Sequence, residues 1–163
     1  MEIRHITEND DFKAVRNIYE KSWQFAYKGI IPQDYLDNIP KEKWGGNLLK
    51  NGRTEIGAFD GDKIVGTASF CPSRWENFSS CGEIVTIYLL PEYIGRGIGS
   101  QLMKACIEEL EFLGFTEILL WVLEDNHRAR RFYEKQGFVC TDDYMDDIIG
   151  GKPLREVMYL RRK

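Results

Sequence analysis

The chain has 163 residues and a formal net charge of −4 at pH 7; 43% of its residues are hydrophobic and 29% are charged. This length and composition are typical of one globular domain, so we expect a single domain over residues 1–163. The acidic balance argues against nucleic-acid binding. The sequence contains neither an apolar run of ~20 residues nor a leading signal segment, which favours a cytoplasmic protein without a membrane span.

The cysteine pattern argues against a metal site. Four cysteines are scattered along the chain without a CxxC pair, and two histidines are the other strong ligands. The six residues are Cys71, Cys81, Cys106, Cys140, His5 and His127. Because zinc sites need close ligand spacing, we expect reduced and mostly buried thiols and no bound metal.

The N-terminal region is predicted to be mainly helical. Residues 2–7 indicate a short strand, and apolar residues at helical spacing predict a helix from Asp10 to about Lys28. Asn9 or Asp10 is the expected N-cap of this helix. Two shorter helical pieces are expected over residues 33–37 and 41–49.

A hairpin and a third strand follow these helices. Residues 55–60 and 63–71 are predicted to be paired strands, because Asp60-Gly61 between them is a strong hairpin signal. The next strand is expected over residues 82–90, where apolar side chains occupy both faces.

A glycine-rich turn at residues 95–100 separates this strand from a helix that runs to about Leu113. The apolar stripe of the helix contains Leu102, Cys106, Leu110 and Leu113. The continuous apolar run at 118–122 is typical of a strand covered on both faces, as in parallel pairing. The unit from 82 to 122 is therefore a candidate for a right-handed crossover.

The last part of the chain is predicted to hold one helix and two strands. Asp125 or Asn126 begins the helix, which ends near Gln136, and the strands cover about 138–145 and 156–161. The order of elements predicts an α/β (α+β) fold with a mixed central sheet of about seven strands flanked by helices.

The segment LLPEYIGRGIGS at residues 89–100 carries the strongest chemical signal. Backbone amides at the start of a helix have no partners and carry partial positive charge, and glycines allow an anion to approach them closely. The turn therefore predicts a phosphate or diphosphate site, with a glycine-rich turn that binds nothing as the alternative. A dinucleotide fingerprint needs a third glycine where Ser100 stands, and the Walker A pattern is absent.

Two motifs in the chain resemble those of the GCN5-related N-acetyltransferases (GNAT). Residues Ile94–Gly99 are similar to the acetyl-CoA motif (Q/R)xxGx(G/A), with Ile94 in place of the usual Gln or Arg. Residues Asn126–Phe138 are similar to the signature NxxAxxFYxxxGF. The resemblance implies the GNAT fold and an enzyme that transfers the acetyl group of acetyl-CoA directly to a primary amine in a ternary complex. The amine would belong to a small molecule, a polyamine or a protein.

The resemblance also implies which residues hold the donor. Backbone groups of the strand before the glycine turn would hold pantetheine and polarise the thioester carbonyl. The turn would hold the diphosphate. Five basic residues could add positive charge there, and Arg96 is the preferred candidate over Arg128, Arg130, Arg131 and Lys135. The implied donor site consists of Ile87, Tyr88, Leu89, Gly95, Arg96, Gly97, Ile98, Gly99, Ser100 and Asn126.

Two residues are the candidates for proton transfer. Tyr133 aligns with the family tyrosine that faces the sulfur of coenzyme A, and an ordinary pKa of ~10 keeps it protonated as a general acid. Glu83 stands where some family members place a basic glutamate. A regular strand puts it about 13 Å from Ile87, so it would act through water or a strand bend.

The acceptor pocket is the least defined part of the prediction. Trp23 and Tyr27, with Tyr35 and Trp44 nearby in sequence, are candidates to wall an amine site, partly by cation–π contact. Packing in the core is the alternative role of these aromatic residues. A homodimer is compatible with the sequence. A non-catalytic acyl-CoA sensor on the same fold is the alternative function.

Overall fold

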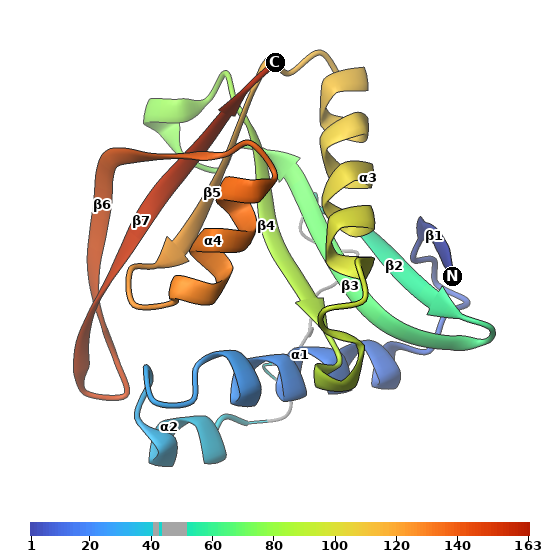
Figure 1. The fold of residues 1–163 in the computed structure, drawn as a ribbon, viewed down its shortest axis with the longest axis horizontal. Helices are drawn as coiled ribbons and strands as arrows, with labels where there is room; N and C mark the ends of the chain where they lie inside the picture. The colour runs from blue at the N-terminus through green and yellow to red at the C-terminus, as the bar shows by residue number, and fades with distance from the viewer. Residues whose placement is uncertain (41–42, 44–51) are drawn as a thin grey trace.

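The computed structural model describes residues 1–40, 43 and 52–163. Within these residues, seven strands form one mixed sheet in the order β1-β2-β3-β4-β5-β7-β6, which confirms the expected architecture (Figure 1). The strands are β1 (Glu2–His5), β2 (Thr54–Asp60), β3 (Lys63–Pro72), β4 (Gly82–Leu89), β5 (Glu117–Leu123), β6 (Val139–Ile149) and β7 (Lys152–Arg162). The α-helices are α1 (Phe12–Ala26), α2 (Gln33–Asp37), α3 (Ile98–Phe112) and α4 (His127–Lys135).

Strands β4 and β5 separate soon after they meet (Figure 1). Among the described residues they pair in parallel at two positions, Gly82 with Ile118 and Glu83 with Leu119. Strand β4 also has a bulge, because Thr86 pairs with Ser69 while Ile84 pairs with the next residue of β3. A bulge bends its strand and increases the local twist, so β4 leaves a gap beside β5.

Helices α1 and α3 cover opposite faces of the sheet. Side chains alternate along β3, so neighbouring residues of this strand point to different helices. A Cβ atom on Gly66 would lie 3.2 Å from Leu102 of α3. The next side chain, Thr67, donates to Glu55, which in turn accepts from Tyr19 of α1. Both faces of the middle strands are therefore buried.

The predicted stripe of α3 is confirmed except at its end. Leu102, Cys106 and Leu110 have no exposed surface, whereas Leu113 is 58% exposed. The helix ends at Phe112, so Leu113 lies beyond the last turn that packs on the sheet.

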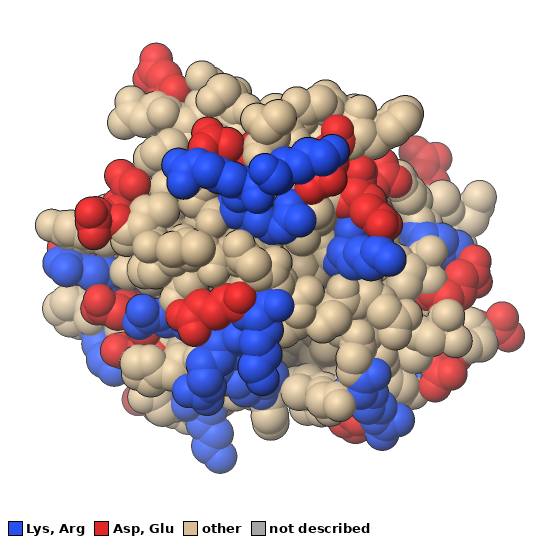
Figure 2. All heavy atoms as spheres, turned by 45° about the horizontal axis from the view of Figure 1, so that its top comes forward, with Lys and Arg blue, Asp and Glu red and all other residues tan. Residues whose placement is uncertain are grey.

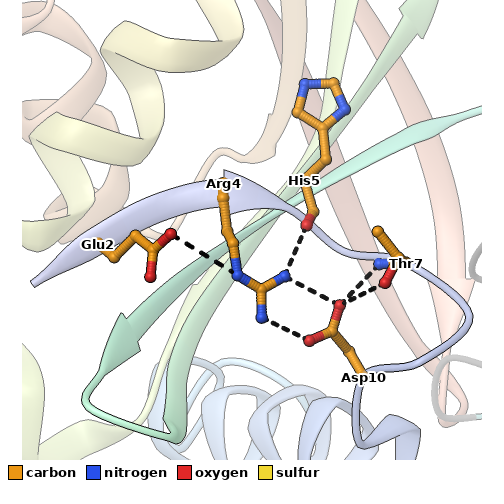
Figure 3. Close-up of polar contacts among 5 residues, drawn as sticks. All are labelled: Glu2, Arg4, His5, Thr7 and Asp10. Carbon is orange, nitrogen blue, oxygen red and sulfur yellow. Dashed lines mark hydrogen bonds and ion pairs between the residues drawn. The ribbon is translucent and has the colours of Figure 1, made fainter.

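Neither predicted cap of the first helix, Asn9 or Asp10, is correct. Asp11 caps α1 by accepting from the amides of its first turn, and Asp10 has a different role. Asp10 accepts from the Arg4 guanidinium at 2.6 Å and from the Thr7 amide at 2.8 Å (Figure 3). These bonds hold the pKa of Asp10 well below its ordinary range and fasten β1 to the turn before α1.

The C-terminal hairpin is longer than expected. Strands β6 and β7 are joined at Gly150 and Gly151, both with positive φ, which extends each strand about four residues beyond its prediction. Two consecutive glycines favour such a hairpin turn, and this signal was missed. The predicted helix at 41–49 and Trp44 lie outside the described residues. None of the helices in the described ranges is long and apolar enough to cross a bilayer.

Candidate active site

A cleft of about 530 Å³ occupies the gap between β4 and β5. Its walls come from β4, the glycine turn, β5, the end of α1, α4 and one residue of β7. Figure 2 shows one face of the molecule, where Lys and Arg gather in separate groups beside an uncharged hollow. The site therefore lies where strands β4 and β5 diverge from each other.

The glycine turn presents backbone amides to this cleft. Gly95 and Gly97 have φ values of 82° and 78°, and a Cβ atom on either would meet nothing within 4 Å. Gly97 is the N-cap of α3 and offers no side-chain cap. In the described part of the chain, no protein acceptor bonds to the amides from Gly97 to Ser100. Free amides at a helix start, in open space, form a ready anion site.

The structure brings most of the sequence-predicted donor residues to this cleft. The residues that line it include Ile87, Tyr88, Leu89, Gly95, Gly97, Gly99, Ser100 and Asn126. Two predicted residues do not line it. The guanidinium of Arg96 lies 4.9 Å from the centre of the Tyr93 ring, and the side chain of Ile98 is buried in the core.

The backbone of Leu89 is already engaged. Ser22 of α1 donates its hydroxyl to the Leu89 carbonyl at 2.6 Å and accepts from the Leu89 amide at 3.1 Å. Leu89 therefore has less to offer a ligand than the two residues before it, Ile87 and Tyr88. The serine fixes the end of β4 to α1 at the mouth of the cleft.

Asn126 and Tyr133 both face the cleft from α4. Asn126 is the N-cap of this helix, as predicted, and its side chain accepts from the Ala129 amide at 3.2 Å. Burial, with a smaller contribution from nearby Tyr88, raises the pKa of Tyr133. The phenol is therefore a protonated donor throughout the neutral range.

A cluster of aromatic hydroxyls lies beside Tyr133. The Trp23 indole donates to the Tyr88 hydroxyl at 3.0 Å. Burial raises the pKa of both Tyr27 and Tyr88, and the Tyr27 hydroxyl lies close enough to Tyr88 and Tyr133 for both to raise its pKa further. Tyr27 lines the cleft, whereas Trp23 stands behind Tyr88. Tyr35 is 40% exposed and lies outside the cleft.

The structure does not bring Glu83 to the cleft. Its side chain is 1% exposed, and its carboxylate accepts from the Arg74 guanidinium at 2.7 Å and from the Trp75 indole at 3.1 Å. Burial acts to raise the pKa of Glu83, but the hydrogen bonds from Arg74 outweigh it and lower the pKa. A carboxylate held in this way is a poor base.

Glu156 was missed by the sequence analysis. It lies on β7 opposite Leu123, and of the described residues that line the cleft it is the acidic one. Burial and the charge of Asp147 raise the pKa of Glu156. A strand register between β5 and β7 places it here, and no local motif announces such a pairing.

Arg128 supplies a positive charge in the cleft wall. Its guanidinium lies 5.0 Å from the centre of the Phe25 ring, across from the end of α1. Burial lowers the pKa of Arg128, and no carboxylate among the described residues pairs with it. Among the described residues that line the cleft, the basic one is therefore Arg128 rather than Arg96.

Similarity to known proteins agrees with this geometry. The sequence model of the acetyltransferase (GNAT) family matches residues 12–138. The uncharacterized N-acetyltransferase YuaI of Bacillus subtilis is 33% identical over 121 residues, which cover 72% of this chain and 69% of that protein. The spermidine N(1)-acetyltransferase of Thermoplasma acidophilum is 26% identical over 158 residues, 91% of this chain and 94% of its own.

A solved structure has the same fold over its full length. The PaiA N-acetyltransferase of Thermoplasma acidophilum, determined in complex with coenzyme A, superposes with a TM-score of 0.78. It is 22% identical, and the match covers 100% of both chains. The open β4–β5 gap, the glycine turn beside it and the match over residues 12–138 together show that the chain belongs to the acetyltransferase (GNAT) family, as an acyltransferase.

Proposed function

We propose that residues 1–163 act as one domain that transfers an acetyl group from acetyl-CoA to a primary amine in a ternary complex. The amine belongs to a small molecule, a polyamine or a protein. The observation that carries the proposal is that the glycine turn, with its free amides, and Tyr133 line the same cleft. Relatives named for N-acetyl transfer, and a similar fold solved with coenzyme A, support it.

The donor would lie along the cleft in a fixed direction. The diphosphate would accept hydrogen bonds from the amides between Gly97 and Ser100. The pantetheine arm would then follow the edge of β4 past Tyr88 and Ile87, where β5 has moved away. This path brings the thioester to the bulge of β4, within the part of the cleft that Tyr133 also lines.

The chemistry then needs a neutral amine and a protonated leaving group. The nitrogen attacks the thioester carbon, and collapse of the tetrahedral intermediate breaks the C–S bond. Tyr133 gives its proton to the sulfur and regains one from the nitrogen, which becomes the amide. A protonated donor at the leaving group contributes about 10²–10⁴-fold to such reactions.

Glu156 would receive the acceptor. Its carboxylate lies in the cleft beside Tyr27 and Tyr88, whose pKa values it influences. An amine enters as an ammonium at neutral pH, because an alkyl amine has a pKa of ~10.4. A half-buried carboxylate attracts that charge more strongly than an exposed one. Glu156 would therefore bind the amine, a different task from that of the general base for which the sequence suggested Glu83.

The test follows the release of free thiol from acetyl-CoA in the presence of a panel of amines. Amine-dependent release that Tyr133→Phe reduces about 100-fold or more supports the proposal. Tyr144→Phe, at an exposed position on β6, is the matched control and keeps wild-type activity. Tight binding of acetyl-CoA without release on any amine would instead indicate the non-catalytic sensor.

A further inference from the structure

A row of polar side chains, two of them buried, crosses the sheet beneath the cleft. Glu55 on β2, Ser69 on β3 and Thr86 on β4 stand opposite one another in register. Glu55 is 2% exposed and Ser69 has no exposed surface. A buried carboxyl group destabilises a fold unless it is hydrogen-bonded, so its partners explain how it is tolerated here.

The partners connect Glu55 to the cleft. The Tyr19 hydroxyl of α1 donates to Glu55 Oε1 at 3.0 Å and lies 3.3 Å from Thr86 Oγ1. Thr86 Oγ1 is 2.7 Å from Ser69 Oγ, and Thr86 lines the cleft. The chain Glu55–Tyr19–Thr86 thus runs from the buried sheet to the wall beside the β4 bulge.

The directions of these bonds follow from the number of hydrogens. A hydroxyl has one hydrogen and two lone pairs. Since Tyr19 gives its hydrogen to Glu55, Thr86 donates to Tyr19, and Ser69 donates to Thr86. Thr86 Oγ1 then keeps one lone pair for a donor in the cleft. An ionised Glu55 therefore orients every hydroxyl of the chain to accept a proton from the cleft side.

We propose, on the basis of the acetyl transfer proposed above, that Glu55 is the remote acceptor of the proton that the amine loses before attack. The ammonium N–H bond breaks and its proton binds Thr86 Oγ1, while the Thr86 proton moves to Tyr19. The Tyr19 proton moves to Glu55 Oε1, which becomes neutral. The nitrogen keeps the electron pair and attacks. After the products leave, the same chain returns the proton to water in the cleft.

The two acids of the site then have different tasks. A carboxylate that pairs with an ammonium favours the charged form of the amine, so Glu156 alone holds the acceptor in its unreactive state. Glu55 lies behind two hydroxyls and leaves the acceptor position free. Its environment also suits proton uptake, because burial raises the pKa of Glu55 to about 7, against bonds from Thr67 and Tyr19 that lower it.

Among the residues that the structure describes, Arg53 is the other charged group that acts on Glu55. Arg53, which precedes β2, lowers its pKa through charge attraction. Tyr88 from β4 and Cys106 from α3 are the neighbouring titratable groups, and burial raises the pKa of each. Both groups are neutral across the neutral range, so Glu55 is the group of this row that changes charge there.

The first measurement is kcat against pH for Glu55→Gln, whose amide oxygen still accepts from Tyr19 and Thr67. The wild type loses activity as the pH falls through about 7, because a protonated Glu55 accepts no proton. In the variant, kcat should be about 100-fold lower and should no longer show this fall at low pH, the acidic limb of the profile. The KM for acetyl-CoA should be nearly unchanged. Tyr19→Phe should cause a similar loss, and the double variant no further loss, because both residues serve one path.

Three further variants separate this role from a structural one. Thr86→Val breaks the chain at the cleft, and Thr86→Ser, which restores a hydroxyl, recovers most of the activity. Thr67→Val removes a bond to Glu55 that lies outside the chain. It is expected to move the acidic limb to higher pH while the plateau kcat stays within about twofold of the wild type, since the path is intact.

The outcomes distinguish the inference from the function on which it rests. Suppose that the wild type transfers acetyl groups and that Glu55→Gln has the same kcat and the same loss of activity at low pH as the wild type. The relay is then overturned and the function stands. If no amine accepts the acetyl group, the proposed function fails first. A carbon NMR titration of the Glu55 carboxyl group needs no turnover. A titration at the ordinary glutamate pKa would overturn the relay in either case.

Discussion

The donor and acceptor sides of the cleft are built in different ways. On the donor side, one stretch of chain from β4 through the glycine turn into α3 supplies neighbouring backbone amides. On the acceptor side, Tyr27, Tyr88, Tyr133 and Glu156 come from four separate elements. The donor side therefore depends on backbone geometry, whereas the acceptor side depends on side chains that the tertiary fold brings together. Substitutions should affect the two sides independently.

The largest effect is expected from Gly97→Asp on the donor side. The new carboxylate enters the open space where the phosphates would lie, and like charges that meet in an interface cost several kcal/mol. Coenzyme A binding, measured by calorimetry, should weaken about 100-fold or more. Gly61→Asp is the matched control, because it has a similar φ of 60° and open surroundings in the β2–β3 turn, and it does not line the cleft. Equal affinity in the two variants would contradict the proposed phosphate site.

The next effect concerns stability beneath the acceptor side. The pKa of Glu55 is raised from 4.5 to about 7, so the protonated form stabilises the fold below the lower value and this contribution is lost as the pH rises through 7. The shift corresponds to ~3 kcal/mol. Glu55→Gln should therefore gain stability relative to the wild type between pH 5 and pH 8, as measured by thermal melts. If the stabilities of the two proteins changed with pH in parallel, the raised pKa of Glu55 would be contradicted.

A smaller effect is expected from Glu156→Gln, which tests whether the two sides are separable. Loss of the cleft carboxylate should raise the KM for the amine about tenfold, an effect of ~1.4 kcal/mol, and leave acetyl-CoA binding unchanged. Because the pKa of Glu156 is raised, the wild-type KM for the amine should also rise as a falling pH protonates this carboxylate. Glu124→Gln, at an exposed position, is the control. If Glu156→Gln changed the affinity for acetyl-CoA instead, the donor and acceptor sides would not be separable.

The smallest effect compares two helix caps. Asn126→Ala and Asp11→Ala each remove a side-chain cap, so each should lower stability by about 1 kcal/mol in urea unfolding. Only Asn126 lines the cleft, so only its variant should also weaken coenzyme A binding. Unchanged binding in both variants would restrict Asn126 to a structural role.

The same contrast explains what the sequence revealed. Elements with local signals were predicted well: the glycine turn, the Asn126 cap and the Asp60-Gly61 hairpin all depend on residues within a few positions. The position of Glu156 in the cleft wall depends on the register of β7 against β5. Hydrophobic alternation alone does not specify this register. Glu83 shows the opposite case, because its local motif matches the family while the turn before β4 supplies Arg74 to its carboxylate. The Arg96 side chain is similarly drawn to a ring contact with Tyr93.

The short β4–β5 ladder has a mechanical consequence. With two residue pairs between them in the described chain, the strands β1–β4 and the strands β5–β7–β6 are two half-sheets sharing a narrow seam. A ligand that fills the gap ties the halves together and stabilises the folded state by mass action. Amide hydrogen exchange along Ile84–Leu89 and Leu120–Leu123 should then slow in the complex. Bound coenzyme A would thus take the place of the β4–β5 pairs that the sheet lacks, and it would join the two half-sheets.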